Sequence, residues 1–150
     1  MPMISETDRR VLRDLFAERM TEDVTMTYFG QRESVLIVPS HECAYCQETR
    51  ELLSELEGLS DKLRLEVKDF VRDEAEASEL GVTHIPAVVL NGRNKGRVRY
   101  FGIPAGYEFS SLVEDLIDVS TGEPDLLAST REVLAGVTRD VHIQVFVTPT

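Results

Sequence analysis

The fold of this chain is decided by residues 35–46, VLIVPSHECAYC. The run at 35–38 is short, apolar and uninterrupted, which is typical of a fully buried strand. A polar break at 39–42 follows it, and then comes the pair Cys43-Ala44-Tyr45-Cys46. From Cys43 a helical pattern continues to Gly58, with its apolar face formed by Leu52, Leu53 and Leu56. The stretch therefore predicts a C-x-x-C pair at the point where a buried strand passes into a helix.

The rest of the chain alternates between strand and helix patterns. Ser5, with Asp8 three residues later, predicts the cap of a first helix that reaches Met20. Further helices are expected around residues 73–80, 112–117 and 126–134, and strands at residues 24–29, 63–67, 87–90, 98–101 and 141–147. This order predicts an α/β fold with a mixed β-sheet flanked by helices.

Composition and charge exclude several classes of protein. The chain has 150 residues, of which 42% are hydrophobic, so it can bury a core. Its formal net charge of −11, from 16 Lys and Arg against 27 Asp and Glu, argues against nucleic acid as a partner. No apolar run has the roughly 18 residues of a membrane span, and no signal-peptide pattern opens the sequence. We therefore expect a cytoplasmic protein with neither a nucleic-acid nor a membrane partner.

The two cysteines are the only ones in the chain, and their spacing points to redox chemistry. A helix N-terminus lowers the pKa of a thiol, so Cys43 is the expected nucleophile and Cys46 the residue that resolves the mixed disulfide. Tyr45 between them is expected to contact a partner chain or peptide. Inert structural thiols remain the alternative, as does a metal site formed by His41, Cys43, Cys46 and His84, although this spacing departs from paired zinc ligands. We expect no metal and no other cofactor.

An internal similarity links the two ends of the chain. Residues 23–29, DVTMTYF, align with residues 140–146, DVHIQVF, at an offset of 117, and Thr21 then falls on Thr138. The helix after Asp8 falls on the helix after Asp125 at the same offset. The repeat predicts that the last residues form the opening helix and strand of a second unit. A strand without neighbours invites pairing, so we expect this segment to pack on the first unit or on a partner chain, with a homodimer as one outcome.

The chain resembles the thioredoxin superfamily through its dithiol motif, the Ile85-Pro86 strand start and the order of its elements. A narrower resemblance is to the glutaredoxin-like protein disulfide oxidoreductases, which have two thioredoxin-like units in tandem. It is carried by the segments YFGIPAGYEF at 100–109, LIDVS at 116–120 and VFVTPT at 145–150. The family places a second C-x-x-C directly after a segment like the last of these, where this sequence ends. The resemblance implies a redox unit at residues 1–120 and a truncated second unit at 121–150, with an inserted turn and strand at 30–40.

The resemblance also implies a function and a binding site. In this family a cis-proline faces the C-x-x-C, so Pro86 and the main chain of Ile85 are expected to bind an extended substrate. The thioredoxin buried carboxylate falls on Ile37, so that general base is missing here. The expected activity is thiol–disulfide exchange on protein or glutathione disulfides, with a thioredoxin reductase-like reductant. The alternative is a non-catalytic interaction module or metal-binding module of the same fold.

Overall fold

The computed structural model of the chain describes residues 2–31 and 43–148. The expected strand at 35–38, Ile37, His41 and most of the inserted segment at 30–40 therefore lie outside the described residues. In the described part, no helix is both long and apolar enough to cross a membrane.

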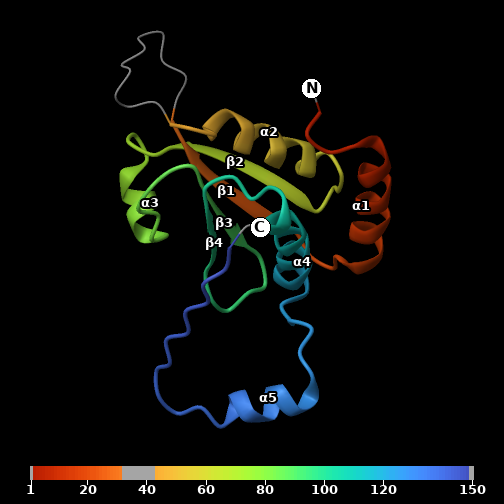
Figure 1. Cartoon of the computed structure of the whole chain (residues 1–150), viewed down its shortest axis with the longest axis vertical. Helices are drawn as coiled ribbons and strands as arrows, with labels where there is room; N and C mark the ends of the chain where they lie inside the picture. The colour runs from red at the N-terminus through yellow and green to blue at the C-terminus, as the bar shows by residue number, and fades with distance from the viewer. Residues whose placement is uncertain (1, 32–42, 149–150) are drawn as a thin grey trace.

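A four-stranded mixed sheet forms the centre of the fold, in the order β2-β1-β3-β4 (Figure 1). Strand β1 (Val24–Gly30) pairs in parallel with β2 (Leu63–Asp69) and antiparallel with β3 (Ala87–Asn91). Strand β4 (Val98–Phe101) pairs antiparallel with β3. The expected α/β fold with a mixed sheet flanked by helices is thereby confirmed.

The alternation of side chains along β1 divides the core between the two faces of the sheet. Val24, Met26 and Tyr28 point to one face, where they pack with apolar side chains of α1 (Glu6–Arg19), α2 (Cys46–Glu57) and α4 (Tyr107–Thr121). Phe29 points to the other face, where it packs with Ala77 of α3 (Glu74–Glu79) and neighbouring apolar residues. Helices therefore cover both faces, as an α/β sheet buried on both sides requires.

Two hydrogen-bonded contacts connect the helices to the rest of the fold. The carboxylate of Glu55 on α2 accepts bonds from the amides of Met3 and Ile4 and from the guanidinium of Arg9. The buried hydroxyl of Ser120 on α4 accepts bonds from the amides of residues 21 and 22, just before β1. These contacts fix the start and the end of α1 against α2 and α4.

The C-terminal segment differs from the sequence expectation. Helix α5 (Ala128–Ala135) is present and lies apart from the sheet, joined to it by extended chain (Figure 1). Residues 141–147 do not form the expected strand, and every residue from 123 to 148 is exposed. A strand needs a neighbour to take its main-chain hydrogen bonds, and no described strand pairs with this segment. The sequence pattern shows strand propensity but says nothing about whether a partner is present.

Candidate functional site

The cysteine pair and the proline loop lie at the same end of the sheet. Strand β1 runs toward this end and stops at Gly30, and β3 starts there because the two strands are antiparallel, with Phe29 opposite Ala87. Phe101 at the end of β4 lies opposite Ala87 in turn. The main-chain amide of Cys43 donates to the side-chain oxygen of Gln31, at 2.7 Å, which ties the motif to the residue after β1.

Cys43 and Cys46 form a disulfide, with their Cα atoms 5.6 Å apart. Helix α2 begins at Cys46, so the expectation that it begins at Cys43 is wrong. The reason is local: Tyr45, which precedes the helix, has a left-handed backbone with φ of 66°, which interrupts helical geometry between the cysteines. The main-chain amide and the hydroxyl of Thr49 both donate to the Tyr45 carbonyl, at 2.9 and 2.6 Å, and support this turn.

The two sulfur-bearing residues differ in exposure. Cys43 is half-buried, whereas Cys46 is only 7% exposed. Tyr45 is 59% exposed and projects from the turn between them. The N-terminal end of the 12-residue helix α2 therefore carries an outer cysteine, Cys43, an inner cysteine, Cys46, and the exposed ring of Tyr45. Unpaired amides and the helix dipole favour negative charge at this end.

The proline loop forms a second part of this end of the sheet. The peptide bond between Ile85 and Pro86 is cis, and the Pro86 carbonyl accepts a bond from the Gly102 amide at 2.8 Å. Ile85 packs against the cluster around Phe29, and its main chain has no hydrogen-bond partner among the described residues. The preceding His84 stacks on Phe101, with ring centroids 4.2 Å apart. The structure thus places Ile85 and Pro86 at the same end of the sheet as the cysteines.

Sequence reasoning missed a side chain that lies beneath the cysteine turn. The hydroxyl of Tyr28, on β1, donates to the main-chain carbonyl of Cys46 at 2.8 Å. Tyr28 is buried, and Gly30 leaves the space that its ring occupies. A tyrosine in an apolar strand reads as an ordinary core residue, so its only signal in the sequence is the small glycine two positions later on the same face of the strand.

The described residues provide no set of ligands for the alternative of a metal site. No group of three or more His, Cys, Asp or Glu side chains capable of holding an ion is present in residues 2–31 and 43–148. His84 is engaged with the Thr83 hydroxyl, at 3.0 Å, and with the Phe101 ring. His41, the other expected ligand, lies outside this part of the chain.

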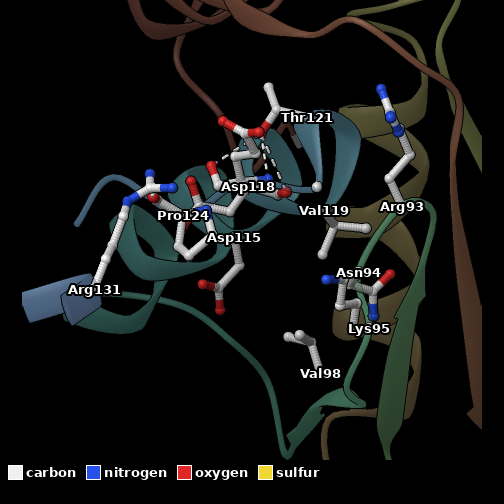
Figure 2. A pocket seen from close by; sticks show the side chains of 12 residues that line it. Arg93, Asn94, Lys95, Val98, Asp115, Asp118, Val119, Thr121, Pro124 and Arg131 are labelled. Atoms are coloured by element: carbon white, nitrogen blue, oxygen red, sulfur yellow. Dashed lines mark hydrogen bonds between the residues drawn. The ribbon is translucent and has the colours of Figure 1, made fainter. Parts of the chain in front are cut away.

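A hollow of about 760 Å³ lies away from the cysteines, between the β3–β4 turn, the end of α4 and the start of α5 (Figure 2). Its lining mixes basic side chains such as Arg93 and Lys95 with acidic ones such as Asp115 and Asp118. Arg131 is already engaged, because its guanidinium donates to the carbonyls of Pro124 and Leu126. The hollow contains none of the residues at the cysteine end of the sheet.

The mixed sheet flanked by helices and the C-x-x-C pair at the start of α2 together define a thioredoxin-fold domain with a redox-type cysteine pair. The model of the thioredoxin domain family matches residues 34–114, and the chain belongs to this family. A probable thioredoxin of Methanothermobacter thermautotrophicus is 29% identical over 83 residues, which are 55% of this chain and 93% of that protein.

Two solved structures share the fold over most of this chain. The protein disulfide oxidoreductase of Aeropyrum pernix K1 is 32% identical, with a TM-score of 0.70, over 88% of this chain and 54% of that one. The alkylhydroperoxide reductase protein AhpF of Enterococcus faecalis is 25% identical, with a TM-score of 0.73, over 90% of this chain and 61% of that one. This chain thus spans between half and two thirds of the length of these two solved proteins.

Proposed function

We propose that this chain is a thiol–disulfide oxidoreductase of the protein disulfide oxidoreductase type, in which Cys43 is the nucleophile and Cys46 the resolving residue. The observation that carries the proposal is the disulfide between a half-buried Cys43 and a buried Cys46 at the start of α2. The amides at this helix start and its dipole favour a thiolate, while Glu48 in the first turn opposes it. We therefore expect a thiol less acidic than that of the strongest oxidants.

The exchange proceeds in two balanced steps from the reduced form. The Cys43 thiolate attacks one sulfur of the substrate disulfide, and the other substrate sulfur leaves as a thiolate and takes a proton from water. Cys46 then loses its proton to solvent, and its thiolate attacks the Cys43 sulfur. The mixed disulfide breaks, the Cys43–Cys46 bond forms, and the second substrate sulfur leaves and is protonated. Two electrons pass from the protein dithiol to the substrate.

The proline loop and Tyr45 are the proposed substrate-binding groups. The main chain of Ile85 is available for hydrogen bonds to an extended substrate, and the bond from the Gly102 amide to the Pro86 carbonyl holds the loop at this end of the sheet. Tyr45 offers an exposed ring on the turn between the two cysteines. We propose protein or glutathione disulfides as substrates, a thioredoxin reductase-like protein as the reductant, and the reducing cytoplasm as the compartment, since the only two cysteines are the motif pair.

The proposal is tested by reduction of insulin disulfides with dithiothreitol as the electron source. The parent protein is expected to accelerate insulin reduction, and Cys43→Ser to abolish the acceleration. Cys46→Ser is the matched control: it keeps the nucleophile, so it is expected to accumulate a mixed disulfide without turnover. Full activity in Cys43→Ser, given an active parent, contradicts the proposed mechanism. Inactivity of the parent with insulin and with glutathione disulfide contradicts the function itself.

We further propose that residues 1–120 are the redox unit and residues 121–150 the opening helix and strand of a second unit that packs on another surface. The support is the repeat, because the two copies have opposite environments. Val24, Met26 and Phe29 are fully buried in β1, whereas their counterparts at positions 141, 143 and 146 are 63% to 88% exposed. An apolar strand of this kind favours burial against a partner.

A homodimer is the simplest association that buries this segment, and it gives the second candidate function, that of an interaction module. Light scattering tests it. The parent chain is expected to be a dimer, and Phe146→Asp to shift it toward monomer, because a charge cannot be buried there without a partner. Val71→Asp is the control, since Val71 is an equally exposed apolar residue in the redox unit, at 82%. A monomeric parent, or equal effects of the two substitutions, contradicts association through the segment.

A further inference from the structure

The Tyr28 side chain joins the central strand to the first residue of the cysteine helix. Its hydroxyl donates to the Cys46 carbonyl at 2.8 Å, and the residue is only 3% exposed. A carbonyl oxygen has two lone pairs, so this bond adds to the helical bonding of the same oxygen rather than replacing it. The bond is shielded from water and acts on the main chain of the residue that carries the inner sulfur.

Gly30 makes this arrangement possible. A Cβ atom built at Gly30 would overlap the Tyr28 hydroxyl oxygen and would lie 2.5 Å from Cζ and 2.7 Å from Cε1. The ring of Tyr28 therefore passes over the position where any other residue would place its side chain. Tyr28 and Gly30 act as a pair, in which the glycine gives the ring its path to the start of α2.

The protonation state of Tyr28 limits what it does. Burial raises the pKa of the phenol to about 12, and the positive charge of Arg50 opposes this only in part. The hydroxyl consequently stays protonated at any physiological pH, where it is a hydrogen-bond donor and cannot accept a proton from Cys46. A positioning role is compatible with this state, and the role of general base is not.

We propose that Tyr28 is a positioning residue for the closing step: its hydroxyl holds the Cys46 main chain at the start of α2 and thereby keeps the Cys46 sulfur where it can attack Cys43. The proposal rests on the exchange function proposed above. In the disulfide form the Cys43–Cys46 bond restrains Cys46 covalently, whether or not Tyr28 is bonded to it. In the dithiol form only non-covalent contacts restrain Cys46. Loss of the Tyr28 bond therefore increases the conformational freedom of Cys46, which formation of the Cys43–Cys46 disulfide must remove.

The test is Tyr28→Phe, which removes the hydroxyl and keeps the ring. The equilibrium constant for forming the Cys43–Cys46 disulfide in glutathione buffers is expected to fall about five-fold, the factor that one ordinary hydrogen bond contributes. For this two-electron couple the shift corresponds to a potential about 20 mV less negative. The matched control is Tyr100→Phe, which removes a hydroxyl that donates to Asp115 in the lining of the hollow away from the cysteines, and is expected to leave the constant unchanged.

A merely structural role would give a different pattern. Tyr28→Phe would then lower the free energy of unfolding equally in the oxidised and the reduced protein. If Tyr28 positions Cys46, the substitution lowers the free energy of unfolding by different amounts in the two forms, and the difference corresponds to the fold-change in the constant for disulfide formation. Gly30→Ala provides a second route, since it displaces the Tyr28 ring without removing the hydroxyl, and it is expected to shift the constant in the same direction. A constant within two-fold of the parent in both variants overturns the positioning role. If the parent itself does not equilibrate with glutathione, the exchange function fails instead.

Discussion

Replacement of Glu55 by Gln tests how the cysteine helix is anchored. The Glu55 carboxylate lies on α2 and accepts bonds from the Met3 amide at 2.7 Å, the Ile4 amide at 3.0 Å and Arg9 at 2.7 Å. Its side chain is only 17% exposed. Burial raises its pKa, but the two amides and the Arg9 charge outweigh burial and hold the pKa below the ordinary value. The ionised form is therefore bound more tightly in the folded chain than in the unfolded chain.

The magnitude follows from these contacts. Gln keeps one carbonyl oxygen as an acceptor, so Glu55→Gln loses one main-chain bond to a charged group and the ion pair with Arg9. Bonds to charged groups contribute roughly 1.5–3 kcal/mol, and a partly exposed ion pair adds little. The free energy of unfolding at about pH 7 is expected to fall by about 2 kcal/mol, which for a urea slope of about 2 kcal/mol/M lowers the midpoint by about 1 M.

The dependence on pH separates the loss of bonds to the ionised Glu55 carboxylate from a general loss of packing. A lowered pKa in the folded state stabilises the protein above the unfolded-state pKa, and this contribution disappears as the pH falls through the folded-state value. The difference between parent and Glu55→Gln in urea unfolding is therefore expected to shrink from about pH 7 to about pH 3. The control Glu51→Gln, at an exposed glutamate one turn earlier on α2, is expected to change little. A loss of unfolding free energy in Glu55→Gln that is below about 0.5 kcal/mol, or is the same at both pH values, would mean that the Glu55 carboxylate does not anchor α2.

Two further substitutions test contacts around the core and the motif. Ser120→Ala leaves the amides of residues 21 and 22 without their acceptor, and urea unfolding is expected to show a loss of about 2 kcal/mol; a loss near zero would mean that water replaces the hydroxyl. Thr49→Val removes the hydroxyl that donates to the Tyr45 carbonyl at 2.6 Å, and the same measurement is expected to show a loss of about 1 kcal/mol; unchanged stability would mean that the Thr49 amide alone supports the turn.

Most of the fold could be predicted from the sequence because its signals are local and strong. Ser5 followed by Asp8 predicts the start of the first helix, and the structure shows the Ser5 hydroxyl accepting from the Asp8 amide at 3.1 Å. Alternation and apolar runs likewise predict all four described strands within one or two residues. The segment at 141–147 has the same pattern and forms no strand, because strand formation also depends on a neighbour that the pattern does not encode.

The candidate site was predictable in its residues but not in its detail. The C-x-x-C spacing and the Ile85-Pro86 strand start identify side chains that the sheet does bring to one end. The start of α2 at Cys46 depends on the left-handed backbone of Tyr45, which composition does not reveal for a residue other than glycine. The Tyr28 bond joins residues 18 positions apart across the strand and the helix, so it becomes visible only once the two elements are packed.

The proposed reversible redox pair of Cys43 and Cys46 is measured most simply as the thiol content of the protein across a series of glutathione redox buffers. We expect a single reversible two-electron transition with a midpoint between about −270 and −120 mV, which is lost in Cys43→Ser. Thiols that do not respond to the buffer ratio, or cysteines that titrate as two independent groups, would contradict it.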